Sequence, residues 1–305
     1  MKRVLLVSSA LCLGAGMATA QGMMSGVTVS GDGRRGVVFD DNEDARFSSR
    51  VRVKFALAAE LDNGLTAGGD IRADNASGGA SGTAGKVFLS GPFGTLAMGD
   101  VDPGAKAALG HVAGVGYTGL GDLNEITYTR GATAEEPALL YTLPKMGPVQ
   151  AYASVGQETM GEGDTAAQEI SFDTFSVGAK ADLAFADMGT AWLGAGFEGT
   201  PDDDADGHFV IGAGASVSGF TGKLLAGTND DADQFGVSAG YSAGVIGATV
   251  FYTDDTEMDG NEALGVGLSW SLGGGASIVG GVATDIGQGD NEDVRHADLG
   301  VTFSF

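Results

Sequence analysis

The sequence predicts an all-β fold, a transmembrane antiparallel β-barrel of about 16 strands. Three observations support this prediction. Apolar and polar residues alternate with a period of two along many segments, as in strands with two different faces. Short turns alternate with longer polar loops, which is the pattern of strands that cross a membrane back and forth. Beyond the N-terminal region no run of about 18 apolar residues occurs, so we expect no membrane helix.

The N-terminus has the composition of a cleavable secretory signal. Lys2 and Arg3 precede a mostly apolar stretch over residues 4–16, and residues 18–20 form an Ala-Thr-Ala cleavage motif. An uncleaved anchor helix is the alternative, but the stretch is shorter than the roughly 20 residues of a membrane span. We therefore expect residues 1–20 to be removed and residues 21–305 to form one barrel domain. Cys12 is the only cysteine, so the exported domain uses no disulfide.

The overall charge limits the choice of partners. With 16 basic and 40 acidic residues the chain has a formal net charge of −24. Nucleic acid is excluded as a partner, because binding a phosphate backbone requires a basic surface. Glycine is abundant, at 54 residues, which disfavours long helices and is compatible with sheets and tight turns.

The alternation is clearest over residues 47–55, where Arg and Lys share one face with Ser while Phe and Val occupy the other. It recurs over residues 65–74 and 298–305. A soluble sandwich would bury the apolar face, whereas a barrel would turn it toward lipid and line a wet lumen with the polar face. Strands near ten residues long, with small residues on the polar face, favour the barrel.

The connections fix the expected strand count. Short turns are expected at residues 61–65, 91–94, 143–148, 183–188, 218–219, 243–245 and 272–275, and longer loops at residues 40–45, 75–85, 156–167, 199–207, 229–233, 254–261 and 285–293. The segments between them number about 16, an even count that places both termini on one side of the membrane.

One connection, from Val101 to Glu136, is too long and too apolar for an ordinary surface loop. It contains a short helix candidate at Gly104–Leu109. We expect residues 101–136 to fold into the lumen and to narrow the channel; packing on the barrel rim is the alternative. The acidic residues that would line this constriction are Asp100, Asp102, Asp122 and Glu125.

Basic residues cluster in the first three expected strands. By the alternation, five of them fall on the lumen face: Arg34, Arg50, Arg52, Lys54 and Arg72. Like charges on neighbouring strands repel, but water-filled lumens retain them because they set selectivity. Arg35 is an exception, because the same alternation turns it outward. A charge facing lipid at mid-depth costs about 2–4 kcal/mol, so Arg35 indicates either a subunit interface or a bulge near residues 31–36 that resets the alternation.

Short stretches spread over the chain resemble the alphaproteobacterial general-diffusion porins. They are residues 29–34, 47–50, 87–91, 98–100, 139–142, 272–281 and 297–301. The resemblance implies a homotrimer of 16-stranded barrels in the outer membrane, through which ions and small hydrophilic solutes diffuse passively. It also implies an infolded third loop with acidic groups opposite a basic wall, and a C-terminal aromatic, here Phe305, that the barrel-insertion machinery recognises. Lys106 and His111 stand where such loops are often acidic, so the resemblance does not fix the sign of ion selectivity.

Three other functions agree less well with the sequence. An enzyme would need a nucleophile, a base and an orienting group, but only three histidines exist and no G-x-S-x-G motif occurs. A cofactor is not expected, although Asp202, Asp204 and Asp206 begin like a calcium-binding loop. That loop lacks a Glu at its twelfth position, so weak Ca²⁺ binding by acidic loops is the most it supports. A sugar-specific barrel would carry lumenal aromatics, whereas the aromatics here are expected to face outward, at Phe55, Trp192, Phe251, Trp270 and Phe303.

Overall fold

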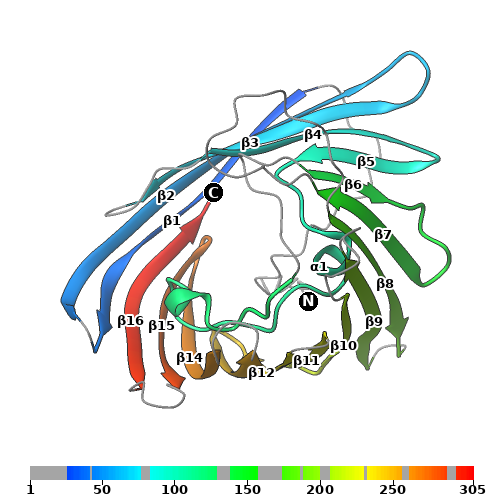
Figure 1. The fold of residues 1–305 in the computed structure, drawn as a ribbon. Helices are drawn as coiled ribbons and strands as arrows, with labels where there is room; N and C mark the ends of the chain where they lie inside the picture. Colours follow the sequence, from blue (N-terminus) through cyan, green and yellow to red (C-terminus); the bar gives the residue numbers. More distant parts are fainter. Residues whose placement is uncertain are drawn as a thin grey trace, which may run out of the picture.

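The computed structural model describes residues 26–41, 43–76, 83–128, 138–156, 174–185, 188–199, 207–229, 232–255, 261–286 and 293–305. Their strands form one closed antiparallel barrel in which neighbours in sequence pair with each other and β1 pairs with β16 to close the ring (Figure 1). The predicted fold class and the count of 16 strands are therefore confirmed.

The strands are β1 (Gly26–Asp40), β2 (Glu43–Glu60), β3 (Thr66–Ala76), β4 (Thr83–Gly91), β5 (Gly94–Gly99), β6 (Ala138–Thr142), β7 (Val149–Gly156), β8 (Thr174–Ala184), β9 (Gly189–Gly199), β10 (His208–Val217), β11 (Phe220–Thr228), β12 (Asp233–Ala243), β13 (Ile246–Asp255), β14 (Asn261–Gly273), β15 (Ala276–Ile286) and β16 (Val294–Ser304). The connection between β5 and β6 carries a short helix, α1 (Gly104–Leu109), where the sequence predicts one, and a 3₁₀ turn, η1 (Leu120–Asp122). Within the described residues no helix is long and apolar enough to cross a membrane.

The predicted short turns lie between the strands as expected. The turn from β2 to β3 shows why these residues form it. The side chain of Asn63 accepts a hydrogen bond from the Leu65 amide at 3.1 Å, and Gly64 takes a φ of +78°, which a side chain would disfavour. Most residues of the longer predicted loops, like the predicted signal at residues 1–20, lie outside the described residues.

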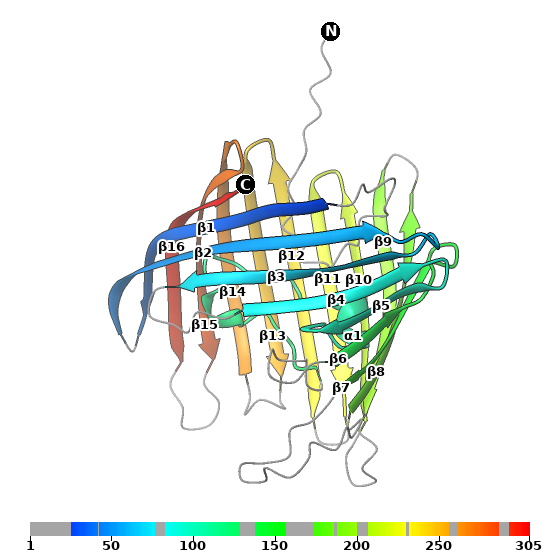
Figure 2. The same ribbon diagram turned by 90° about the horizontal axis from the view of Figure 1, so that it is seen from above.

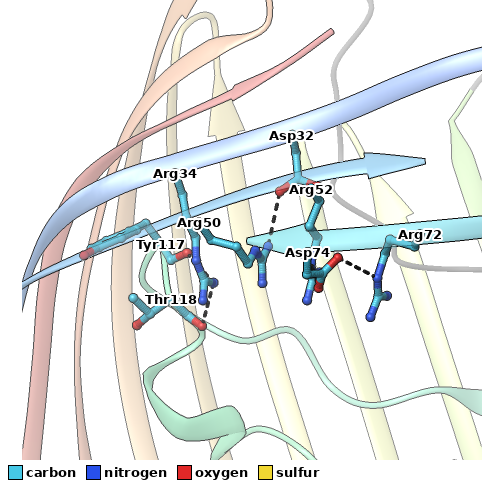
Figure 3. A network of polar contacts seen from close by, with 8 residues as sticks. All are labelled: Asp32, Arg34, Arg50, Arg52, Arg72, Asp74, Tyr117 and Thr118. Atoms are coloured by element: carbon cyan, nitrogen blue, oxygen red, sulfur yellow. Dashed lines mark hydrogen bonds and ion pairs between the residues drawn. The ribbon is translucent and has the colours of Figure 1, made fainter. Parts of the chain in front are cut away.

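Figure 2 shows the same barrel turned by 90°. Many large apolar side chains of its strands are exposed. On β2, Val51 is 46% exposed and Phe55 is 41% exposed, while Arg52 between them points to the inner side (Figure 3). An apolar exterior and a charged interior are the arrangement of a barrel embedded in lipid.

The register of β1 tests one of the two explanations for the outward position of Arg35, namely the bulge. β1 and β2 pair without interruption from Gly26 to Val38, and β1 pairs with β16 throughout from Asp32 to Asp40. The register with β2 shifts between Val38 and Asp40, beyond residues 31–36, and Arg35 keeps the phase of the exposed Val37. A bulge that turns Arg35 inward is therefore wrong. Arg35 is exposed and lies between Ser49 and Val301 of the neighbouring strands, on the outward face.

Two of the aromatics expected to face outward face inward. On β9 the outward residue is Leu193, 58% exposed, so Trp192 points to the interior. On β13 Val250 is exposed and Phe251 is only 1% exposed. Both aromatics pack against the connection between β5 and β6, which supplies an apolar surface that the alternation of a single strand does not reveal.

Candidate pore-lining site

The five predicted wall cations lie on one face of three adjacent strands, as expected from the alternation: Arg34 on β1, Arg50, Arg52 and Lys54 on β2, and Arg72 on β3. The register places Arg34 opposite Arg50, and Lys54 opposite Arg72. Figure 3 shows the four arginines in a row along the inner surface. We call these five residues the basic wall.

Three aspartates of the same strands, which the sequence analysis did not assign to the site, are interleaved with the basic wall. Asp32 on β1 pairs with Arg50 at 3.2 Å. Asp70 on β3 pairs with Lys54 at 3.3 Å. Asp74, also on β3, binds Arg52 and Arg72 at 2.7 and 3.0 Å. The period-of-two alternation in the sequence identifies these three aspartates as lumenal, because each lies an even number of residues from a wall cation on its own strand.

The described part of the predicted constriction loop, residues 101–128, lies along the inner face of β7 to β16, within the ring of strands in Figure 1. Backbone amides of this segment donate hydrogen bonds to inward-facing hydroxyls of the strands. Gly104 donates to Ser154 at 2.9 Å, and Ala105 donates to Ser176 at 2.8 Å. Because α1 leaves its first amides without intrahelical partners, these hydroxyls satisfy donors that would otherwise be buried unpaired.

Inward-facing glycines make room for the segment. A Cβ atom on Gly196 would lie 2.5 Å from the Cβ of Ala105, and one on Gly267 would lie 2.8 Å from the Cβ of Val115. Such distances are too short for real side chains. The inward-facing glycines of these strands, such as Gly196 and Gly267, therefore leave the space that residues 104–116 occupy. We call them the glycine track.

Apolar contacts complete the attachment. Leu109, Val112 and Val115 of the segment are 2–4% exposed and belong to one buried cluster with side chains of the strands. The strand members of that cluster are Val210, Leu225, Phe251, Ala263 and Ala283, with Trp192 at its edge. Burying side chains of this kind contributes about 1.5–3 kcal/mol each, so the segment is held by more than its hydrogen bonds.

Near its middle the segment contacts both strands that close the barrel. Arg34 on β1 donates from Nη1 to the carbonyl oxygens of Tyr117 and Thr118, at 3.1 and 3.0 Å (Figure 3). Asp298 on β16, 7% exposed, accepts from the amide and the hydroxyl of Thr118, at 2.7 and 2.6 Å. One member of the basic wall therefore binds the segment directly.

The four predicted loop acids occupy different surroundings. Asp100 is half-buried just after β5. Asp102 lies 3.6 Å from Lys106 of the same segment, so these two charges partly cancel within it. Asp122 is exposed at a φ of +60° and is near enough to Arg34 for their opposite charges to interact. Glu125 is exposed, at 46% of its side chain, but the residues around it desolvate the carboxyl group enough to raise its pKa.

His111 lies beside Glu125, with 3.4 Å between its Nε2 and Oε2 of Glu125. Burial, with smaller contributions from Lys106 and Lys223, lowers the pKa of His111 from 6.5 to about 3. The imidazole is therefore neutral at pH 7, and the contact with Glu125 is not an ion pair. Nδ1 accepts a hydrogen bond from the Ile126 amide, which leaves the ring proton on Nε2.

A second polar group lies under the segment. Glu198 is fully buried, accepts a hydrogen bond from the Ser176 hydroxyl at 2.9 Å and contacts Nδ1 of His208 at 3.2 Å. The serine and the histidine both face the carboxylate. A hydrolase would instead need the histidine to accept the serine proton. The geometry of this group is that of a support for α1.

The residues proposed for calcium, Asp202, Asp204 and Asp206, lie outside the described residues, so weak Ca²⁺ binding stays a prediction. Among the residues that the structure does describe, no group of three or more His, Cys, Asp or Glu side chains could hold a metal ion.

A closed barrel with an apolar exterior and a charged interior defines a channel-forming outer-membrane protein. Comparison with known proteins gives the family. The Gram-negative porin family matches residues 7–305, and the chain belongs to this family. It is a family of channels and not of enzymes, and its members reside in the outer membrane.

Individual relatives agree with this assignment. A porin of Rhodobacter capsulatus is 36% identical over 306 residues, which cover 92% of this chain and 100% of that protein. Solved structures of Rh. blastica porin variants are similar with TM-scores of 0.71 and 0.70 at 22% identity, over 92% of this chain and 100% of theirs. At that identity the likeness concerns the fold, and it agrees with the closed barrel of this chain.

Proposed function

We propose that ions and small hydrophilic solutes diffuse through the lumen of this general-diffusion porin along the basic wall, and that residues 101–128 narrow their path. The observation that supports this most is the contact of Arg34 with the Tyr117 and Thr118 carbonyls. It brings the segment up to the basic wall. A permeating ion then passes between the wall and the exposed acids Asp122 and Glu125, which create a field across the path.

The principal experiment is planar-bilayer recording on the detergent-extracted protein. We expect stepwise increases in conductance as single channels insert. Replacing Arg50 and Arg52 by glutamine removes two positive charges from the wall, so the reversal potential in a KCl gradient should move toward cation selectivity. A folded protein that produces no steps would refute channel function. An unchanged reversal potential in the double variant would remove these arginines from the ion path.

We also propose that residues 1–20 direct export and are cleaved, and that three copies assemble into a homotrimer. Arg35 supports the assembly. It is an exposed cation on the outward face, where contact with lipid would be costly and contact with a second copy would not. Phe305 supports recognition by the barrel-insertion machinery, because it ends the last strand with an exposed aromatic ring.

A further inference from the structure

The carboxylate of Asp74 is shared by two arginines of the basic wall. Its Oδ2 accepts from Nε of Arg52 at 2.7 Å, and its Oδ1 accepts from Nε of Arg72 at 3.0 Å. Arg52 lies directly across from Asp74 on the neighbouring strand, while Arg72 lies two residues away on the same strand. The register and the period of two together place one negative charge between two positive ones.

Both arginines use Nε for this contact, so their terminal nitrogens remain directed away from the carboxylate. Figure 3 shows the guanidinium groups of Arg52 and Arg72 on either side of Asp74 and extending beyond it, away from the strands. A permeating anion would therefore meet donors that are still accessible. It would also meet the nearby negative charge of Asp74, which weakens the attraction.

Asp74 differs from the other two aspartates of the wall. It is the least exposed, at 11%, compared with 19% for Asp70 and 45% for Asp32. Screening by water and salt is weakest for the least exposed charge. Asp74 also lies closest to its partners, whereas Asp32 and Asp70 are 3.2 and 3.3 Å from theirs.

The position of Asp74 along the basic wall also distinguishes it from Asp70. Arg34, which contacts the loop segment, is across from Arg50, and Arg50 is two residues from Arg52, the partner of Asp74. Asp70 lies four residues farther along β3, about 13 Å away at the rise of a strand. Asp74 is thus the aspartate of β3 nearer to the point where the wall and residues 101–128 meet.

We propose that Asp74 is a specificity-determining residue, which offsets the charge of Arg52 and Arg72 and so limits the preference of the pore for anions. The inference rests on the proposed function, because it assumes that ions pass along the basic wall. The three aspartates together offset part of the charge of the five cations, and Asp74 is the one that acts on two arginines at once.

The test is the reversal potential of Asp74→Asn in a KCl gradient at about 0.1 M ionic strength, where the Debye length is about 10 Å. Asparagine keeps the shape of the side chain and removes only its charge. We expect the anion-to-cation permeability ratio to rise by about three- to fourfold. One unit charge roughly 6 Å from an ion, screened over this Debye length in a water-like dielectric, favours the anion and disfavours the cation by about twofold each when it is removed.

Two further variants make the result specific. Asp70→Asn removes the same charge from the same face of the same strand, between Lys54 and Lys86, and should change the ratio by less than half as much. Arg72→Gln combined with Asp74→Asn restores the formal charge of the wall and should return the ratio toward wild type. These two control variants also exclude a loss of fold as the cause, because each must still insert into the bilayer as a channel.

Asp74→Asn channels with the wild-type reversal potential would overturn the inference, and so would an equal shift in Asp70→Asn. A folded wild-type protein that gives no channels at all would instead refute the proposed function. The two failures are therefore distinguishable.

Discussion

Replacing Asp298 by alanine should detach the middle of the loop segment, at Thr118, from strand β16. Asp298 accepts two hydrogen bonds from Thr118, one from the amide and one from the hydroxyl, and both are charge-assisted. A hydrogen bond to a charged group contributes about 1.5–3 kcal/mol, so Asp298→Ala should weaken the attachment by about 3 kcal/mol at the lower bound. Since about 1.4 kcal/mol corresponds to a factor of ten, the detached fraction should rise about 100-fold.

Hydrogen exchange of the Thr118 amide measures this detachment directly. We expect exchange in Asp298→Ala to be about 100-fold faster than in wild type, and single-channel current to become noisier. Thr118→Val keeps the amide donor and loses the hydroxyl, so its exchange should be faster by about tenfold only. Asp182→Ala, which removes an exposed ion pair with Lys145 at the end of β8, should leave the segment unchanged.

The reasoning fails if Thr118 exchanges at the wild-type rate in Asp298→Ala while the amides of the barrel strands keep their protection. That result would mean that the glycine track and the apolar cluster hold the segment without help from Asp298. Loss of protection in the strands as well would indicate general unfolding, and Thr118→Val would then provide the measurement.

Three more outcomes are expected. Gly196→Val should lower the free energy of unfolding by about 1–3 kcal/mol, and with it the melting temperature, because the added atoms overlap Ala105. Gly222→Ala is the control, since the atom nearest to its added Cβ would lie 3.9 Å away. Below pH 6.5 the unfolded chain protonates His111 while the folded barrel does not until about pH 3, so stability falls as the pH decreases through this window, by up to about 5 kcal/mol. His111→Gln should flatten that decline in thermal melts between pH 7 and pH 4, and a wild-type slope would contradict the assignment. Arg35→Leu should lower the temperature at which the proposed trimer dissociates on native gels, whereas a higher temperature would place Arg35 in lipid.

The strands were predictable because their two faces differ in composition. Residues 47–55 show this well, since every second side chain is charged or small and polar and the others are mostly Val and Phe. Turn chemistry at Asp62, Asn63 and Gly64 then marks where the chain reverses. These signals are local, so one sequence is enough to locate them.

The sequence of one strand does not show which residues of another segment pack on its inner face. Trp192 and Phe251 were assigned to the exterior because aromatics usually face lipid in such barrels, yet they pack on residues 101–128. The pairing of Asp74 with Arg52 was missed for a similar reason. It depends on the register between β2 and β3, and a shift of one residue would turn one of the two side chains to the other face.

The contacts of Thr118 have a consequence for the order of folding. They join residues far apart in the chain, with a separation of 180 positions to Asp298 and 84 to Arg34, and those partners lie on the first and last strands. Contacts of such high sequence separation form late, because the entropy of closing long loops must be lost first. The middle of the segment can therefore reach its final position only when β1 and β16 meet, so completion of the pore and completion of the barrel are one kinetic event.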